Sequence, residues 1–201
     1  MKNVAMFAAV VACAAGSVSA IVIDFDDLAT GTAISNQYSE AVFSTVASHF
    51  NVALGFAGIS LPNILCTQVI GGAVDCLQPV FVDFTNPVNN LSFLAVEPNQ
   101  FGTVAEVNIF SSNVYVGTVP ITGLGPAPGR FGSGSVIVDL SAFTNVTRIE
   151  IVAPAGFPTI DNSEGGNGVG YDLFTFDVVP APSSIALLGV GALFAGRRRR
   201  A

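Results

Sequence analysis

Aspartates near the two ends of the predicted globular body could bind a metal ion. In the stretch "IVIDFDDL" (residues 21–28), strand alternation places the apolar side chains on one face and Asp24 and Asp26 on the other, and Asp27 follows at the turn. Asp172 shares the parity of the phenylalanines that follow it and is expected on the core side, where a carboxylate needs a partner. Asp26, Asp27 and Asp172 therefore form a candidate structural calcium site if the two strands are neighbours. The alternative is that the first two are solvated surface acids and that Asp172 caps a turn.

Residues that could catalyse hydrolysis are scarce. His49 is the single histidine, and the chain has neither a Gly-x-Ser-x-Gly elbow nor a His-Glu-x-x-His helix. The sequence therefore lacks the motifs of serine-triad hydrolases and of zinc proteases. Paired carboxylates could serve glycoside hydrolysis, but the chain has no tryptophan to stack on sugar rings and only Tyr38, Tyr115 and Tyr171 as tyrosines. We therefore expect no enzymatic activity. A weak carbohydrate-binding or calcium-binding module is the first alternative, and a glycan-acting enzyme is a distant one.

Two cysteines in the body predict a disulfide. Cys66 and Cys76 are ten residues apart, and in an oxidising compartment they would close a small loop. Free thiols are the alternative. A zinc site is not indicated, because two cysteines and the distant His49 do not make a four-ligand set.

The elements that must position these residues are short apolar runs separated by Gly, Pro and Asn. None keeps a helical period over a dozen residues, and several alternate at every second position, as around Ile149 and Ile151. Runs at this spacing predict an all-β fold, an antiparallel β-sandwich. Residues 123–134 and 161–168 are the clearest long loops. The ten runs are "IVIDF", "AVFSTV", "NVALGF", "PVFVDF", "NLSFLAV", "VAEVNIF", "NVYVGTV", "SVIVDL", "VTRIEIV" and "DLFTFDVV".

The charge of the body excludes nucleic acid as a partner. Residues 21–179 contain all 14 acidic residues but only Arg130 and Arg148 of the seven basic ones, which gives a formal charge of 2 − 14 = −12. Phosphate backbones are bound through Lys and Arg, so such a body would be repelled by them. The charge fits a soluble extracellular module, or one that attracts cations such as calcium.

The N-terminal segment has the form of a secretory signal. Lys2, the apolar run of residues 4–15 and the small residues that end at Ala20 predict a signal helix that is removed after export. The alternative is a bacterial lipoprotein box that ends at Cys13.

The C-terminal segment predicts a short transmembrane helix. Residues 183–196 carry no charge, and 14 residues make a helix of about 21 Å against a hydrocarbon core of about 30 Å. Pro180 and Pro182 would end any helix upstream, and Arg197 to Arg200 supply the cytoplasmic positive charge that fixes orientation. A buried core helix is the alternative, and the four arginines directly after the run argue against it.

This tail resembles the PEP-CTERM sorting signal of exported bacterial proteins. The resemblance rests on the box Val179, Pro180, Ala181 and Pro182, then the apolar run, then the cluster Arg197, Arg198, Arg199 and Arg200. The family usually has Glu where this chain has Ala181. The resemblance implies transient anchoring in the inner membrane, processing by an exosortase-like membrane protease, and delivery to the cell surface or an exopolysaccharide matrix.

Parts of the body resemble β-sandwich ectodomains that precede such tails and are similar to the jelly-roll folds of carbohydrate-binding modules. The resemblance implies that the first and last strands lie side by side. The expected organisation is a signal peptide over residues 1–20, a β-sandwich ectodomain over 21–179 and a sorting signal over 180–201. The expected role is structural or adhesive. The pieces that carry the resemblance are "IDFDDLATGTAISNQY", "VFVDFTNPVNNLSF", "VIVDLSAFTNVTRIEI" and "GVGYDLFTF".

Overall fold

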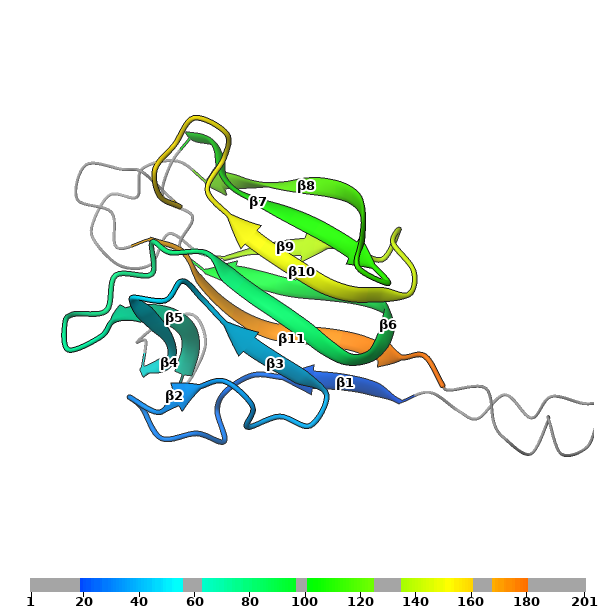
Figure 1. The fold of residues 1–201 in the computed structure, drawn as a ribbon, viewed down its shortest axis with the longest axis horizontal. Coiled ribbons are helices and arrows are strands. Elements are labelled where there is room, and N and C mark those ends of the chain that lie inside the picture. The colour runs from blue at the N-terminus through cyan, green and yellow to red at the C-terminus, as the bar shows by residue number, and fades with distance from the viewer. Residues whose placement is uncertain (1–18, 56–62, 97–100, 125–134, 161–167, 181–201) are drawn as a thin grey trace, which may run out of the picture. The chain divides into compact units, whose positions relative to one another are not determined.

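The computed structural model (Figure 1) describes residues 19–55, 63–96, 101–124, 135–160 and 168–180. These residues form strands and connecting turns, with no helix among them. Within the same ranges no helix is long and apolar enough to span a membrane. The predicted signal and transmembrane helices lie outside the described residues. The strands are β1 (Ala20–Ile23), β2 (Ala33–Ile34), β3 (Ala41–Ser44), β4 (His49–Gly55), β5 (Asn63–Val69), β6 (Val80–Val96), β7 (Phe101–Ser111), β8 (Val114–Leu124), β9 (Ser135–Asp139), β10 (Val146–Val152) and β11 (Gly170–Val178).

All strand pairings of the described residues are antiparallel, which confirms the all-β prediction. The hydrogen-bonded order is β2-β4-β5-β11-β6-β10-β7-β8, with β1 beside β11 and with β3 and β9 beside β6. The long strand β6 organises this sheet. Its first half pairs with β3 and β10, and its second half pairs with β9 and β11.

The two halves of β6 are separated by a change of register at Pro87. Val146 of β10 pairs with Val88, whereas Arg148 pairs with Asp83, so β6 has three extra residues between these two pairs. A proline has no backbone N–H to donate to a sheet, and a change of register is a place where it is tolerated. The strand therefore continues through "TNPVNN", where the sequence predicted an interruption between two separate runs.

The hydrophobic core lies between the strands that pair with the two halves of β6. Phe84, in the first half, contacts Phe176 of β11 with a ring-centroid distance of 5.1 Å. Phe43 of β3 contacts Phe174 of β11 at 5.5 Å, and both side chains are buried. Edge-to-face contacts of this kind add to the free energy that burial of the rings provides. The phenylalanines of the strand runs therefore serve mainly to pack the core.

The first and last strands lie side by side, as the jelly-roll resemblance implied. β1 pairs with β11 from Ala20↔Asp177 to Ile23↔Phe174. The start of β1 and the end of β11 therefore meet at one end of the body, as Figure 1 shows. Residues Ser19–Val179 form one compact unit.

Candidate functional site

The predicted strand "IVIDF" is shorter than expected, and this changes the position of its carboxylates. β1 ends at Ile23, and Phe25 has a positive φ of 60° that turns the chain while its ring stays buried. Asp24 and Asp26 therefore lie in a turn and do not share the face of a strand. The Oδ1 atom of Asp24 accepts a hydrogen bond from the backbone N–H of Asp26 at 3.2 Å, an arrangement typical of aspartates in turns.

The turn is held by Asn63, a buried residue that the sequence analysis did not identify. The Nδ2 atom of Asn63 donates to the carbonyl oxygens of Phe25 and Leu28 at 3.3 and 2.7 Å. The backbone N–H of Asn63 donates to Oδ1 of Asp26 at 2.9 Å. These contacts join the start of β5 to the acidic turn. One carboxylate of the predicted calcium site therefore accepts a hydrogen bond from the protein itself.

Asp27 has a different partner, the hydroxyl of Tyr38. That hydroxyl donates to Oδ1 of Asp27 at 2.6 Å. Partial burial of the ring, together with this hydrogen bond and the nearby negative charges, raises the pKa of Tyr38 above its ordinary value. Deprotonation of this tyrosine is disfavoured in the folded state, so the folding stability that it contributes is present below its unfolded pKa and is lost as the pH rises beyond it.

Asp172 is fully buried, but it does not share the face of Phe174, although its parity predicted that it would. Tyr171 and Phe174 both contact the ring of Phe93, so the β-bulge after Asp172 shifts the alternation of β11. Asp172 pairs with Leu94 on the other face. Its Oδ1 atom accepts a hydrogen bond from the N–H of Leu173 at 2.7 Å, and Leu173 has a φ of 49° at a β-bulge. The described residues contain no group of three or more His, Cys, Asp or Glu side chains that could hold a metal ion. Calcium binding by Asp26, Asp27 and Asp172 remains a prediction, and the melting temperature measured with calcium and with chelator tests it.

The predicted disulfide between Cys66 and Cys76 is present. It links β5 to the segment after it, with a Cα–Cα distance of 4.7 Å. The carbonyl oxygen of Cys76 accepts a hydrogen bond from the N–H of Val169 at 3.1 Å, just before β11 begins. The disulfide therefore fixes a segment against which the last strand docks. A loop of this length contributes about 3 kcal/mol in the chain-entropy model.

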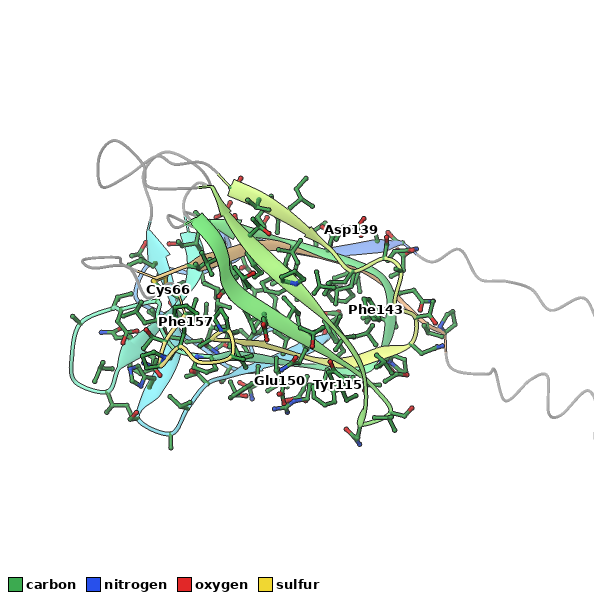
Figure 2. The ribbon with its side chains drawn as sticks, turned by 90° about the horizontal axis from the view of Figure 1, so that it is seen from above. Cys66, Tyr115, Asp139, Phe143, Glu150 and Phe157 are labelled. Atoms are coloured by element: carbon green, nitrogen blue, oxygen red, sulfur yellow. A yellow bond between two sulfur atoms is a disulfide. The ribbon has the colours of Figure 1, made fainter. Side chains whose placement is uncertain are left out.

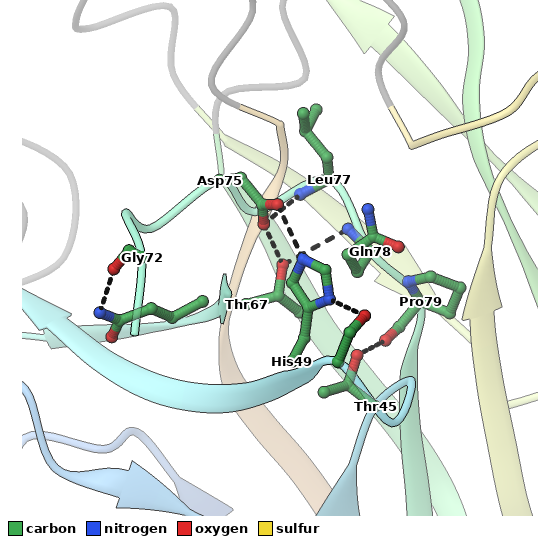
Figure 3. Close-up of polar contacts among 10 residues, drawn as sticks. Thr45, His49, Thr67, Gly72, Asp75, Leu77, Gln78 and Pro79 are labelled. Atoms are coloured by element: carbon green, nitrogen blue, oxygen red, sulfur yellow. Dashed lines mark hydrogen bonds and ion pairs between the residues drawn. The ribbon is translucent and has the colours of Figure 1, made fainter. Parts of the chain in front are cut away.

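Next to the disulfide lies a polar cluster formed by Ser48, His49, Thr67 and Asp75 (Figure 3). The Nδ1 atom of His49 lies 2.9 Å from the Ser48 hydroxyl, and its Nε2 atom lies 3.1 Å from Oδ2 of Asp75. The hydroxyl of Thr67 donates to Oδ1 of Asp75 at 2.8 Å. The backbone N–H of Gln78 donates to the same Thr67 hydroxyl at 3.4 Å. The cluster links β4, β5 and the segment after β5. It could not be predicted from the sequence, because Asp75 belongs to no motif.

A row of exposed and partly exposed side chains crosses five strands on the outer face of the sheet. Register places Val42, Asp83, Arg148, Phe110 and Tyr115 side by side on β3, β6, β10, β7 and β8. The parallel row beside it contains Phe81, Glu150 and Asn108. Figure 2 labels Tyr115 and Glu150 on this face. We call this surface the aromatic–polar face, defined by Phe81, Asp83, Asn108, Tyr115, Arg148 and Glu150.

Arg148 organises the centre of the aromatic–polar face. Its Nη1 atom lies 3.0 Å from both carboxylate oxygens of Asp83, and its Nε atom donates to Oε1 of Glu150 at 2.9 Å. The guanidinium carbon lies 5.2 Å from the centroid of the Phe81 ring, a cation–π contact. One cation between two carboxylates leaves these three charged groups with a net charge of −1.

Tyr115 is the most exposed aromatic side chain of the aromatic–polar face, with 56% of its surface accessible. Its hydroxyl lies 2.7 Å from the hydroxyl of Thr118, which donates to Oδ1 of Asn108 at 2.6 Å. The ring of Phe110 supports it edge-on at 5.9 Å. Tyr115 and Arg148 are far apart in sequence, so only the strand register brings them to one surface. Of the other two tyrosines considered for sugar contact, Tyr38 packs against the core and Tyr171 is buried.

The end of β11 leads directly into the tail that resembled a sorting signal. The family model described as "PEP-CTERM protein-sorting motif" matches residues 178–200. The chain ends in a PEP-CTERM motif. Such a motif implies an exported protein with a C-terminal membrane-anchored sorting signal that an exosortase recognises. No curated protein matches the chain. The match begins at Val178, the last residue of β11, so the matched segment overlaps the end of the body in sequence.

Proposed function

We propose that this PEP-CTERM protein is a non-catalytic component of the cell surface or of an exopolysaccharide matrix. The observation that carries the proposal is the motif at residues 178–200, which begins at the last residue of the strand that completes the body. An export signal, a transient anchor in the inner membrane and a soluble acidic body together describe a protein that is made to be displayed or released. The signal peptide over residues 1–20 and the membrane helix over residues 183–196 belong to this proposal.

We also propose that the body is a jelly-roll-like β-sandwich. Three observations support this assignment: the antiparallel pairing of β1 with β11, the long strand β6 that serves two sets of strands, and a core packed with phenylalanines from both sets. A sandwich closed by its first and last strands is a stable body that does not need the tail. It would therefore persist after the tail is removed.

The sorting proposal is tested by following the full chain in a host that has an exosortase and in the same host without it. We expect a processed form that lacks the Arg cluster, found at the cell surface or in the medium, only where the protease is present.

Two variants of the tail test which of its residues processing requires. Replacing Arg197, Arg198, Arg199 and Arg200 by Ser should impair anchoring and processing, because the cytoplasmic charge is lost. Ala181→Glu restores the residue usual in the family and should speed processing. Equal processing in both hosts would contradict the proposal.

The aromatic–polar face favours a second function, weak binding of an uncharged glycan chain. Tyr115 offers an exposed ring for stacking, and Asn108, Asp83 and Glu150 offer acceptors for sugar hydroxyls. The negative charge of the face and of the whole body disfavours anionic polysaccharides. A single prominent tyrosine without tryptophan is consistent with low affinity.

Affinity electrophoresis of the body, residues 21–179, through gels that contain neutral polysaccharides tests this second function. Tyr115→Ala should abolish any retardation. The control is Phe157→Ala, which removes another half-exposed aromatic ring outside the aromatic–polar face. Equal retardation of the two variants would exclude the aromatic–polar face as the binding surface.

A further inference from the structure

The described part of the body reaches the box near which the proposed sorting protease would cut. The backbone N–H of Val179 donates to the carbonyl oxygen of Pro87 at 2.8 Å, and Pro180 is the next residue. The box of residues 179–182 therefore begins at a residue that is itself hydrogen-bonded to the body. In the sequence, residues 180–182 separate Val179 from the apolar run at Ser183, a span of about 10 Å when fully extended.

The end of β11 is held on both sides. Asp177 pairs with Ala20 of β1 and with Asn89 of β6, and its Oδ2 atom accepts a hydrogen bond from Nδ2 of Asn90 at 2.7 Å. Val178 pairs with Val88 and packs against the core. A strand paired with two neighbours cannot at the same time lie extended in the active site of another protein.

A protease that cleaves a peptide bond needs several residues on each side of that bond in an extended, accessible conformation, which folded strands do not offer. Hydrolysis adds the hydroxyl of one water to the carbonyl carbon and a proton to the leaving nitrogen, so both faces of the bond must be reachable. On the N-terminal side of Pro180, the residues that would occupy such a site are Asp177, Val178 and Val179, the first residue of the box. The body holds Asp177 and Val178 in its sheet, and it holds Val179 by a backbone hydrogen bond to Pro87.

We propose that the folded body restricts access of the sorting protease to the box, so that cleavage proceeds through local opening of the C-terminal end of β11. This inference rests on the proposed function and adds a regulatory step to it. Cleavage of a transiently opened site follows the population of the open form. The sorting rate is then set by the stability of a few terminal pairs in β11 as well as by the motif itself.

The test uses the full chain in the host that has the exosortase, followed by pulse-chase and by the mass of the mature C-terminus. A Gly-Ser-Gly-Ser insertion between Val178 and Val179 keeps the box of residues 179–182 intact and supplies an extended approach without opening β11. We expect it to raise the rate of cleavage roughly fivefold or more, because the backbone hydrogen bonds at the strand end need no longer open. The matched control carries the same insertion between Ser112 and Asn113, in the exposed turn that joins β7 and β8.

A second variant weakens the strand end without changing the spacer. Asn90→Gly removes the side chain that binds Asp177 and tolerates the positive φ of 53° at this position. It should also accelerate cleavage. If the parent chain is processed and neither variant is faster than the control, the restriction is refuted and the sorting proposal stands. If neither the parent nor the spacer variant is processed, both proposals fail.

Discussion

At the scale of single residues, Gly168 is, among the described glycines, the one where a side chain is least tolerated. Its φ is 78°, and a Cβ atom there would lie against the carbonyl group of Cys76 and 2.8 Å from the carbonyl oxygen of Asp75. Gly168→Ala should lower the free energy of unfolding by about 3 kcal/mol or more, through overpacking and strain together. Gly31→Ala is the control, because Gly31 has a similar φ of 88° with no heavy atom within 4 Å of the added Cβ. It should cost about 1 kcal/mol. Urea unfolding of the body measures both changes in the free energy of unfolding. Equal losses in the two variants would mean that backbone strain alone, and not the close contact at Gly168, causes the destabilisation.

A second residue-scale prediction concerns two buried asparagines with opposite expected effects. Asn51 and Asn63 are both 1% exposed. Within the described residues the side-chain amide of Asn51 has no hydrogen-bond partner, whereas that of Asn63 bonds the carbonyl oxygens of Phe25 and Leu28. A buried amide without a partner costs about 1–3 kcal/mol, so Asn51→Leu should stabilise the body by about 1 kcal/mol. Asn63→Leu should destabilise it by about 2 kcal/mol or more. Thermal unfolding that ranks the two variants in the reverse order would contradict this account.

At the scale of elements, most strands could be predicted from alternation, and the exceptions have physical causes. β5 was missed because five consecutive residues, Asn63 to Thr67, are buried, so no alternation of polar and apolar residues marks it. β2, Ala33–Ile34, is too short to show a period. β6 was divided in two because Pro87 and its neighbouring asparagines are typical of turns, yet paired strands on each side of Pro87 keep the chain extended.

Candidate sites formed by residues close together in the sequence could be predicted, and the site formed by residues far apart could not. The disulfide could be predicted because Cys66 and Cys76 are the only cysteines after the predicted signal peptide. The motif at the C-terminus could be predicted because it is contiguous in sequence. The aromatic–polar face could not, since its residues lie on β6, β7, β8 and β10 and only the pairing register aligns them.

The central element is β11, and its removal should abolish folding. It pairs with β1, β5 and β6, and it contributes the buried rings of Phe174 and Phe176. A chain of residues 21–179 should unfold cooperatively, whereas one of residues 21–169 should show neither a cooperative transition nor near-ultraviolet ellipticity. Loss of two buried phenylalanines alone costs about 6 kcal/mol, which is comparable to the whole stability of a domain. A cooperative transition in the shorter chain would show that the tail-bearing strand is dispensable.

At the scale of the whole molecule, the charge of the body opposes its compact state. Two basic and 14 acidic residues in residues 21–179 repel one another over distances that salt can screen. Two acids form local ion pairs with Arg148 that salt weakens: Asp83 lies 3.0 Å and Glu150 2.9 Å from its guanidinium, and all three side chains are partly exposed. Exposed pairs of this kind contribute about 0–1 kcal/mol, which is less than the summed repulsion of a body with this net charge.

Salt should therefore stabilise the body. Raising sodium chloride from about 0.02 M to about 0.5 M shortens the screening length from about 20 Å to about 4 Å, which removes most long-range repulsion but only part of a contact at 3.0 Å. We expect the urea midpoint to rise with salt and to approach a plateau. Arg148→Met is the informative variant, because it removes the arginine that pairs with Asp83 and Glu150 and adds to the net negative charge. Its midpoint should rise more steeply with salt than that of the parent. The opposite result would be a urea midpoint that falls with salt in the parent but not in Arg148→Met. It would mean that the ion pairs of Arg148, and not the net charge, determine how salt changes the stability of this body.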